Sequence, residues 1–340
     1  MKRRAAVIGA SGYAGGELVR LLDAHPVFDL VWLGAHSRAG ARLGEVHPHL
    51  SGGDRRLAQT TPEDIPPVDA VFLALPHGAS YQLGHELADR GAAVFDLGSD
   101  YRFDTPQRYE KAYGSPHPAA DRLGEWSYGL PELFDLKGAR RVALPGCYPT
   151  AVLLAAVPLL AAGLATGPVV ADCLSGVSGA GRSLRPELLF GQVAEGARAY
   201  GIATHRHRPE IEMGMEKAGV SVQVTFTPHL LPIQRGLLAT VTMPAAGALV
   251  DRTDLLGVLD KAYQGRSLVE VVEVPPQTRW VAGSSRAIVT AFFDSHTGMV
   301  IAQGALDNLL KGAASQAVQA ANLVFGLEEE LGLDRTGWMP

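Results

Sequence analysis

The sequence predicts an α/β protein whose first half forms a doubly wound parallel sheet and whose second half forms an α+β domain with a mainly antiparallel sheet. In the first half, short apolar strands alternate with helical segments, as in a parallel sheet. In the second half, β-branched and alternating strands follow one another with one helix among them. A buried apolar helix that begins beside a cysteine lies at the junction of the two halves.

Length and composition are those of a globular protein of two domains. The 340 residues are 47% hydrophobic and 19% charged, with a net charge of −5. This charge gives no reason to expect nucleic acid or a membrane surface as a partner, and no apolar run approaches the ~18–20 residues of a membrane span. Two cysteines are too few for a disulfide framework, and the N-terminal apolar run breaks at Gly9, too early for a secretory signal. We expect a soluble, cytoplasmic protein.

The first predicted strand, residues 5–8, runs into a glycine-rich loop and then an amphipathic helix over residues 14–24. Gly9 allows a tight turn, Gly12 lets the backbone approach a pyrophosphate, and Gly15 lets the helix pack on the strand. This context predicts a Rossmann-type dinucleotide site, the alternative being a glycine-rich turn without a ligand. The cofactor residues assigned to this loop are Gly9, Ser11, Gly12, Tyr13, Ala14 and Gly15.

The second predicted strand, residues 30–35, ends close to Ser37 and Arg38. A protein that binds NAD usually offers Asp or Glu here to the ribose 2′-hydroxyl, whereas an arginine suits a 2′-phosphate. We therefore predict NADP as the cofactor, with Ser37 and Arg38 among its ligands. A solvated surface arginine is the alternative.

Two further strands and a helix complete the first half. They are predicted at residues 70–75 and 92–95 for the strands and 79–90 for the helix. Because ligands bind at the carboxyl ends of such strands, Pro76 is assigned to the cofactor, and Ser99 and Arg102 to the substrate. His77 is interpreted as a turn residue without a catalytic role. Residues 104–140 show no clear period and are interpreted as an ordered connection.

Cys147 is predicted to lie at the start of a helix. Pro145 and Gly146 make a sharp turn before it, and residues 151–162 are an apolar run rich in Ala and Leu. The backbone N–H groups and the dipole of a helix N-terminus favour a thiolate over a thiol. Cys147 is therefore predicted to be a nucleophile rather than a packed small residue. Cys173, inside an apolar strand, is expected only to pack.

Two segments of the second half can bind anions. In the first, glycines alternate with small hydroxyl residues, so that Ser178 and Gly179 are assigned to the cofactor, a flexible loop being the alternative. The second places two histidines and two arginines before a helix. Arg206 and Arg208 suit an acidic substrate and are assigned to it.

Either histidine of this segment, His205 or His207, can move a proton near neutral pH. We favour His207 because it lies nearer the start of the following helix, where a neutral imidazole is favoured. The His-x-His pair also resembles a metal pair. No further Cys/His cluster completes four ligands in the sequence, so no metal is predicted.

Alternating and apolar patterns predict the remaining elements of the second half, which are six strands and two helices. The strands are predicted at residues 169–173, 220–226, 237–242, 268–274, 286–293 and 299–302, and the helices at 252–263 and 305–322.

A dinucleotide, a cysteine at a helix start and a basic His/Arg segment suggest one chemistry. The thiolate attacks an acyl group and expels phosphate, and hydride from NADPH converts the thioester to a thiohemiacetal that collapses to an aldehyde. A Cys/His hydrolase and a non-catalytic NADP-sensing module are alternatives. The glycine loop argues against the first, and Cys147 at a helix start argues against the second.

Motifs across nearly the whole chain resemble the N-acetyl-gamma-glutamyl-phosphate reductase family, which is related to aspartate-semialdehyde dehydrogenase. The matching segments are residues 9–15, 37–38, 96–102, 128–133, 145–150, 175–182, 205–211 and 307–313. The sister reductase of the lysine route, an alternative, tends to carry Gly-Cys-Asn where this chain has Gly146-Cys147-Tyr148.

The resemblance implies NADPH-dependent reduction of an acyl phosphate to an aldehyde in arginine biosynthesis, with Cys147 as nucleophile and the His-Arg-His segment as acid/base. It also implies that the last helix returns to the cofactor domain and that Asn308 lies near the nicotinamide. The expected domains are then residues 1–146 with 305–340 for NADP, and 147–304 for catalysis and oligomerisation. We expect a homodimer or homotetramer.

Overall fold

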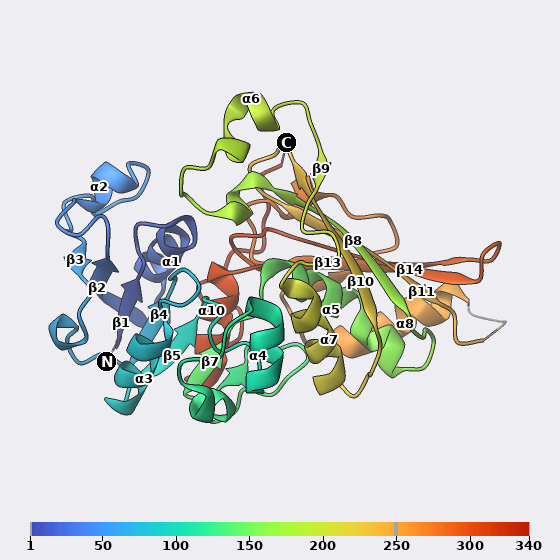
Figure 1. Cartoon of the computed structure of the whole chain (residues 1–340), viewed down its shortest axis with the longest axis horizontal. Helices are drawn as coiled ribbons and strands as arrows, with labels where there is room; N and C mark the ends of the chain where they lie inside the picture. The colour runs from blue at the N-terminus through green and yellow to red at the C-terminus, as the bar shows by residue number, and fades with distance from the viewer. Residues whose placement is uncertain (1, 248–250, 340) are drawn as a thin grey trace. The chain divides into compact units, whose positions relative to one another are not determined.

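A computed structural model describes residues 2–247 and 251–339 of the chain (Figure 1). The chain divides into two compact units. Unit 1 comprises residues 1–145 and 313–333, and unit 2 comprises residues 146–312 and 334–340.

Unit 1 is built on a seven-stranded sheet with all strands parallel, in the order β3-β2-β1-β4-β5-β7-β6. Its strands are β1 (Arg3–Ile8), β2 (Phe28–Ala35), β3 (Ala58–Gln59), β4 (Ala70–Leu73), β5 (Ala93–Asp96), β6 (Ser127–Tyr128) and β7 (Arg141–Ala143). The central strands β4 and β5 are buried along their whole length, which explains their continuous apolar runs. The predicted doubly wound sheet is confirmed, and its strand order reverses between β1 and β4, where such folds bind ligands.

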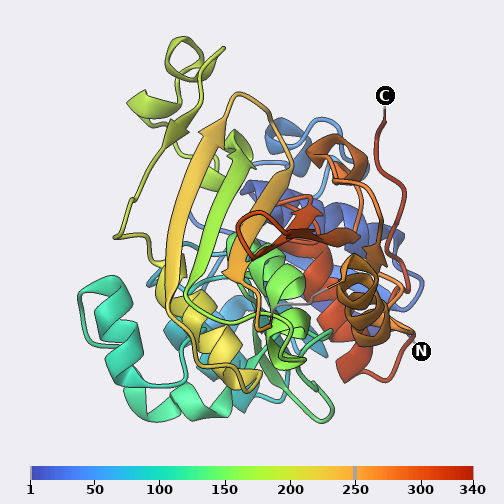
Figure 2. The same cartoon turned by 90° about the vertical axis from the view of Figure 1, so that its right-hand side faces the viewer.

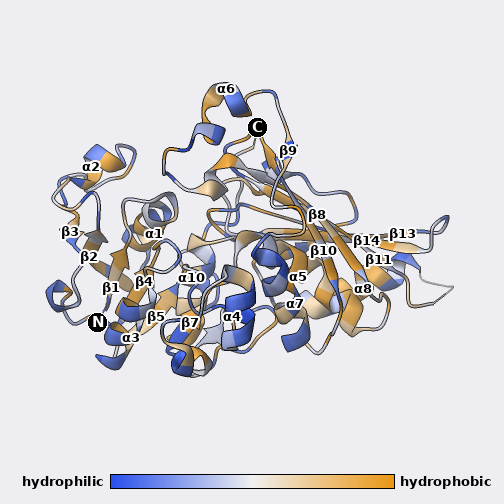
Figure 3. Cartoon of the chain, in the orientation of Figure 1, coloured by the Kyte–Doolittle hydropathy of each residue, from blue (hydrophilic) through white to orange (hydrophobic). Residues whose placement is uncertain are grey.

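The helices of unit 1 are α1 (Tyr13–Ala24), α2 (Leu43–Val46), α3 (Tyr81–Asp89), α4 (Pro106–Tyr113) and α10 (Ala314–Val324), with short 3₁₀ turns at Pro62–Asp64 and Ala120–Glu125. The last helix, α10, packs against α1 and β5. Helix α4 lies in the segment that the sequence analysis left without a helix. Figure 3 shows why: α4 is mainly hydrophilic, so it has almost no apolar stripe. Its start is defined instead by Thr105, whose side chain caps the Arg108 N–H.

Unit 2 is built on a mixed seven-stranded sheet in the order β12-β13-β14-β11-β8-β10-β9. Its strands are β8 (Val169–Gly176), β9 (Arg198–Ala199), β10 (Val224–Leu231), β11 (Leu237–Pro244), β12 (Val269–Val271), β13 (Ala287–Asp294) and β14 (Met299–Leu306). The pairs β8–β10 and β12–β13 are parallel and the other neighbours are antiparallel, so the predicted mainly antiparallel sheet is confirmed.

The helices of unit 2 are α5 (Cys147–Ala161), α6 (Phe190–Val193), α7 (His207–Lys217), α8 (Arg252–Tyr263) and α9 (Thr278–Val281), with 3₁₀ turns at Val177–Ala180 (η3) and Pro186–Leu188 (η4). Helix α5 packs against β11, β13 and β14 and contacts both α7 and α8. Figure 2 shows α5, α7 and α8 on one face of the sheet. Because α5 is covered on all sides, its sequence is apolar all round.

The predicted closing helix over residues 305–322 is wrong in its first part. Ala305 and Leu306 end strand β14, where they pair with residues of β11 and β13, and α10 begins only at Ala314. Ladder hydrogen bonds on both sides outweigh the helix propensity of these residues. The compact units accordingly divide after Gly312, whereas the sequence analysis placed the boundary before residue 305. Residues 334–340 belong to unit 2, although they were expected in the cofactor domain.

The predicted strand over residues 220–226 is also displaced. Strand β10 begins at Val224, which pairs with Val169, and continues past Pro228 to Leu231. Its register is set by the parallel pairing with β8, which the β-branched run at Val220 did not reveal. The predicted strand over residues 268–274 is reduced to Val269–Val271.

Candidate active site

Cys147 is the first residue of α5, as the sequence predicted. It is half-buried, and the preceding residue, Gly146, is the N-cap in extended conformation. The Gly146 N–H donates to Oε1 of Glu210 at 2.9 Å, and the Thr150 hydroxyl donates to the Gly146 carbonyl at 2.9 Å. These bonds fix the backbone immediately before the sulfur, at the helix end that favours a thiolate.

Glu210 connects this helix start to the start of α7. Its carboxylate is fully buried, and Oε2 lies 3.9 Å from Nε2 of His207, the first residue of α7. The sequence analysis gave Glu210 no role. Its spacing from His207 was a usable signal, because residues three apart share one face of a helix.

His205 lies against His207 and next to the residue that follows the nucleophile. The two imidazole centroids are 4.8 Å apart, and both rings contact Tyr148, at 6.0 and 5.8 Å. Nδ1 of His205 accepts the N–H of His207 at 3.1 Å. Burial, and to a lesser extent the positive charge of Arg206, lower the pKa of His205 to about 4, so this ring is neutral near pH 7.

The two arginines of this segment stay near the histidines. Arg206 is the exposed N-cap of α7, and Arg208 is half-buried one residue after His207. Tyr200 closes the other side of His205, with ring centroids 5.5 Å apart and its hydroxyl 3.0 Å from that of Tyr148.

The unit 2 residues assigned to the cofactor come together. Asn308, in the loop after β14, donates from Nδ2 to the Ser178 hydroxyl at 2.9 Å and accepts the Gly236 N–H at Oδ1 at 2.9 Å. A Cβ on Gly179 would lie 3.7 Å from Asn308 Nδ2. The side-chain amide of Asn308 is therefore held in one orientation against the loop that follows β8.

Gly312 brings the same loop against the nucleophile. A Cβ at this position would lie 2.7 Å from the Cys147 Cβ and 2.8 Å from the Asn308 carbonyl oxygen, closer than real Cβ atoms approach. Only glycine allows the chain after β14 to pass so close to the start of α5. Cys147, Asn308 and Ser178 thus belong to one neighbourhood of unit 2.

In unit 1, the glycine loop has the geometry that its pattern predicted. Gly9 adopts a positive φ of 90°. A Cβ on Gly15 would lie 2.1 Å from the Gly9 carbonyl oxygen, so α1 starts directly against β1. Gly12 is the N-cap of α1, Ser11 and Ala14 are half-buried, and Tyr13 is exposed. A helix start of this kind is a place where proteins bind anions.

The other unit 1 residues assigned to the cofactor lie at the carboxyl ends of strands. Ser37 and Arg38 are exposed just after β2, and Pro76 is exposed just after β4. All three therefore lie at the edge of the sheet where doubly wound folds bind nucleotides.

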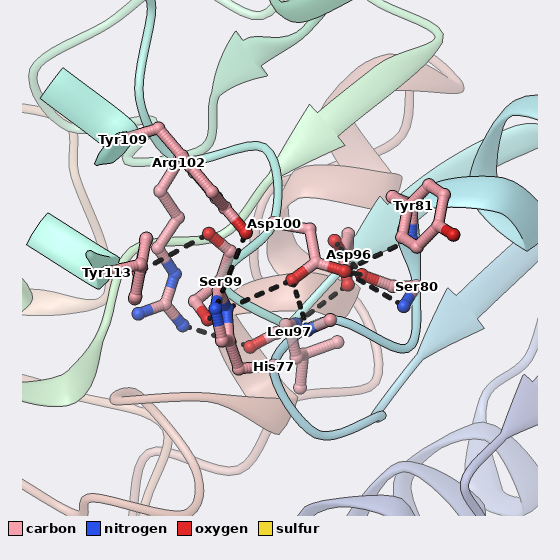
Figure 4. Close-up of polar contacts among 12 residues, drawn as sticks. His77, Ser80, Tyr81, Asp96, Leu97, Ser99, Asp100, Arg102, Tyr109 and Tyr113 are labelled. Atoms are coloured by element: carbon pink, nitrogen blue, oxygen red, sulfur yellow. Dashed lines mark hydrogen bonds and ion pairs between the residues drawn. The ribbon is translucent and has the colours of Figure 1, made fainter. Parts of the chain in front are cut away.

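A polar network at the ends of β4 and β5 surrounds the two predicted substrate residues (Figure 4). Nδ1 of His77 lies 2.8 Å from the Ser99 hydroxyl and 3.2 Å from Oδ1 of Asp100. The Asp100 carboxylate also accepts backbone N–H groups of residues 78, 80 and 81. Arg102 is buried and donates to the Leu97 carbonyl at 2.9 Å. His77 is therefore part of a hydrogen-bonded network. The interpretation of His77 as a turn residue did not predict these contacts.

Asp96 lies beneath this network and is fully buried. Its carboxyl accepts the Gly98 N–H at 2.7 Å and the Ser80 hydroxyl at 2.8 Å, and that hydroxyl also lies 2.9 Å from Asp100. Burial first, and then the charge of Asp100, raise the pKa of Asp96 to about 7. The folded protein therefore keeps a proton on Asp96 that the unfolded chain loses near pH 4.

The wild type is expected to lose stability through Asp96 as the pH rises, and the Asp96→Asn variant is expected not to show this loss. Because the folded pKa is raised, the contribution of Asp96 to the free energy of unfolding falls between about pH 4 and pH 7, by up to about 1.4 kcal/mol per pH unit. Asparagine imitates the protonated acid and has no such slope. Urea unfolding at pH 5.5 and pH 8 measures how much the free energy of unfolding of each protein changes with pH. Asp104→Asn, a second replacement of Asp by Asn, is the control. Parallel stability curves for wild type and Asp96→Asn would contradict the assignment.

Within residues 2–247 and 251–339, no three His, Cys, Asp or Glu side chains gather in a way that could hold a metal ion. No helix in those same ranges is both long and apolar enough to cross a membrane.

Two family models match most of the chain. Residues 4–138 match the family model described as "Semialdehyde dehydrogenase, NAD binding domain", and residues 147–308 match "Semialdehyde dehydrogenase, dimerisation domain". The chain therefore belongs to the semialdehyde dehydrogenase family.

Relatives that cover the full length of the chain include N-acetyl-gamma-glutamyl-phosphate reductases. The one from Arthrobacter sp. (strain FB24) is 45% identical over 98% of each chain, and the one from Pelotomaculum thermopropionicum is 42% identical over 100% of each. The resemblance carried by the sequence motifs is confirmed.

Solved structures extend the likeness to the fold. Aspartate semialdehyde dehydrogenase II of Vibrio cholerae, complexed with ASA, superposes with a TM-score of 0.71 at 19% identity over 95% of this chain and 98% of its own. The enzyme of Candida albicans with NADP gives 0.67 at 16% identity, covering 97% and 100%.

Proposed function

We propose that the chain reduces N-acetyl-gamma-glutamyl phosphate with NADPH to N-acetylglutamate 5-semialdehyde and phosphate, the aldehyde-forming step of arginine biosynthesis. The observation that carries this proposal is Cys147 at the N-terminus of α5, with Glu210 linking that helix start to His207. The full-length similarity to reductases of this substrate supports the choice of acyl phosphate.

The residues for the cofactor fit a dinucleotide. The close approach of Gly15 to Gly9 sets the start of α1 directly against β1, where the helix N-terminus suits a pyrophosphate, and the exposed Arg38 suits a 2′-phosphate. Ser178, Gly179 and Asn308, which lie together in unit 2, are the residues we propose for the nicotinamide. NADPH supplies the hydride.

Cys147 acts as the nucleophile in this proposal. Its Sγ forms a bond to the acyl carbon of the substrate, the bond from that carbon to the phosphate oxygen breaks, and phosphate leaves. After hydride addition the carbon–sulfur bond of the thiohemiacetal breaks, which releases the aldehyde and restores the thiolate. Tight packing at Gly312 and the bond from Gly146 to Glu210 keep the sulfur in one position through both steps.

His207 supplies and removes the proton on the substrate oxygen. The ring of His207 lies beside the buried Glu210, with Nε2 3.9 Å from its Oε2, and this carboxyl group is placed to orient the ring. Arg206 and Arg208 would attract the phosphate and carboxylate of the substrate.

The decisive experiment runs the reaction backwards. With N-acetylglutamate semialdehyde, NADP and inorganic phosphate, NADPH formation is expected to depend on phosphate. Aspartate semialdehyde, tested beside it, is expected to react far more slowly. Equal rates with aspartate semialdehyde, or none with either aldehyde, would contradict the proposal.

Arg38→Ala is expected to narrow the preference for NADP over NAD. A charge-assisted contact to the 2′-phosphate is worth roughly 1.5–3 kcal/mol, so the ratio of the two kcat/KM values should fall by about one to two decades. Arg4→Ala is the control, because Arg4 is exposed on β1 away from the carboxyl ends of the strands. An unchanged ratio in the Arg38 variant would place that arginine in solvent.

A further inference from the structure

Residues 334–339, which we call the tail, pack on unit 2 after the chain has left α10. The backbone of the tail is hydrogen-bonded at two points to the segment that follows α9. The Ser285 N–H donates to the Asp334 carbonyl at 2.7 Å, and the Trp338 N–H donates to the Ala282 carbonyl at 2.8 Å. These two bonds fix the path of the tail and bring Trp338 to a defined place on unit 2.

Two glycines let Trp338 pack directly against the backbone of this segment. A Cβ on Gly283 would collide with the indole of Trp338, and a Cβ on Gly337 would collide with the Trp280 carbonyl oxygen. Gly283 also has a φ of 81°, which side chains other than that of glycine rarely allow. The ring therefore has a specific seat, although it is 57% exposed.

The indole of Trp338 contacts a charged group. The guanidinium carbon of Arg235 lies 5.1 Å from the centroid of the ring, within the range of a cation–π attraction. Nη1 of the same arginine lies 3.6 Å from Oδ2 of Asp307, whose carboxylate is fully buried. Arg235 thus connects the tail to the residue that precedes Asn308.

Asp307 and Asn308 are both held by the segment of Arg235. Oδ2 of Asp307 accepts the Gly283 N–H at 2.7 Å, and its Oδ1 accepts the backbone N–H groups of the two residues after Asn308. Gly236, the residue after Arg235, donates its N–H to Oδ1 of Asn308 at 2.9 Å. Two neighbouring residues of one loop therefore fix two neighbouring residues of the other.

We propose that Trp338 and Arg235 are positioning residues for the side-chain amide of Asn308. The tail holds Arg235 against Asp307, and this ion pair fixes the backbone on which the Asn308 amide is oriented. Nδ2 of Asn308 carries two hydrogens and donates one to Ser178, so the other can be donated to the carboxamide oxygen of the nicotinamide. This inference rests on the proposed function, which assigns Asn308 to that ring. An amide that is already oriented loses less entropy when the cofactor binds.

The experiment compares Trp338→Ala with two matched variants of the full chain. Trp338→Phe keeps an aromatic face for Arg235, and Met339→Ala changes the next residue of the tail, which is 52% exposed. Because Trp338 is more than half exposed, its loss leaves the core intact, and an unchanged circular dichroism spectrum verifies this. Calorimetric titration measures the dissociation constants of NADP and of 2′,5′-ADP, a fragment that carries the 2′-phosphate but lacks the nicotinamide.

We expect Trp338→Ala to raise the dissociation constant of NADP about three- to tenfold and to leave that of 2′,5′-ADP unchanged. A general weakening of the fold would not separate the two ligands in this way. Trp338→Phe should stay within about twofold of wild type for both ligands, because it retains the ring over the guanidinium. Met339→Ala should bind both ligands as wild type does.

A double-mutant cycle with Asn308→Ala tests the route of the effect. Asn308→Ala should itself weaken NADP binding, and Trp338→Ala should add less than about a twofold change to it, because the group that Trp338 positions is already gone. Wild-type affinity for NADP in Trp338→Ala, an equal loss for 2′,5′-ADP, or the same loss in both backgrounds would overturn the inference.

These titrations need no acyl substrate, so they test the inference whichever acyl phosphate the chain reduces. A failure of the reverse reaction with N-acetylglutamate semialdehyde would contradict the proposed substrate alone. Wild-type affinity for NADP in Asn308→Ala would contradict the assignment of Asn308 to the nicotinamide, and this inference with it.

Discussion

Replacing Cys147 with serine is expected to lower turnover by about three or more decades while NADP binding stays intact. A serine hydroxyl at the start of α5 has neither the low pKa nor the nucleophilicity of a thiol, so the acyl transfer fails. The volume of the side chain hardly changes, and the close contact of Gly312 with residue 147 is kept. Steady-state rates in both directions and fluorescence titration with NADPH measure the two effects.

Cys173 provides the matched control. It is fully buried on β8, and burial raises the pKa of its thiol well above the usual value, so it has no part in the chemistry. Cys173→Ala should keep the wild-type rate in the folded protein, and we expect iodoacetamide to inactivate this variant and the wild type alike. If Cys147→Ser turned over at a near-normal rate, the nucleophile would have to be sought elsewhere.

Replacing His207 with asparagine is expected to lower kcat by about two to four decades, with a much smaller change in KM. The variant loses the group beside Glu210 that carries the proton, and one limb of the pH profile should disappear with it. Asparagine retains polar atoms near the ring position and leaves the backbone of α7 intact. The measurement is kcat and kcat/KM from about pH 5 to about pH 9.

His205→Asn is the paired variant, and it should mainly raise KM. Its ring is neutral near pH 7 and accepts the backbone N–H of His207, so its loss disturbs the placement of substrate and of its neighbour rather than the proton transfer. An exchange of the two phenotypes would reverse the assigned roles. If neither variant slowed the chemical step, the segment would only bind anions.

The sequence by itself determined the features that depend on neighbouring residues. The glycines at positions 9 and 15 predicted the turn and the close start of α1, because φ and steric clearance are local properties. Pro-Gly followed by an apolar run predicted that Cys147 begins a helix. Alternating strands and helices predicted the parallel sheet of unit 1. Strands that are buried on both faces have continuous apolar runs, and such runs can be recognised in the sequence.

Elements with mixed or weak local signals were decided by pairing with distant segments. Residues 305–306 favour a helix by composition, yet Ala305 lies in β14 between Leu238 and Ile288. The hydrophilic helix α4 gave no apolar period to read, although its Thr105 cap is a local signal that was present. In both places the free energy that selects the structure comes from contacts that periodicity does not record.

The candidate site was named from the sequence but assembled only by the tertiary structure. Gly146 and Glu210 are 64 residues apart, and Ser178 and Asn308 are 130 apart, yet each pair is hydrogen-bonded. The packing of α5 on α7 makes the first bond, and the position of β14 beside β11 makes the second possible. Motifs identify which side chains can do the chemistry. Which atoms meet is set by burial of apolar surface between elements far apart in the chain, and that is a property of the whole fold.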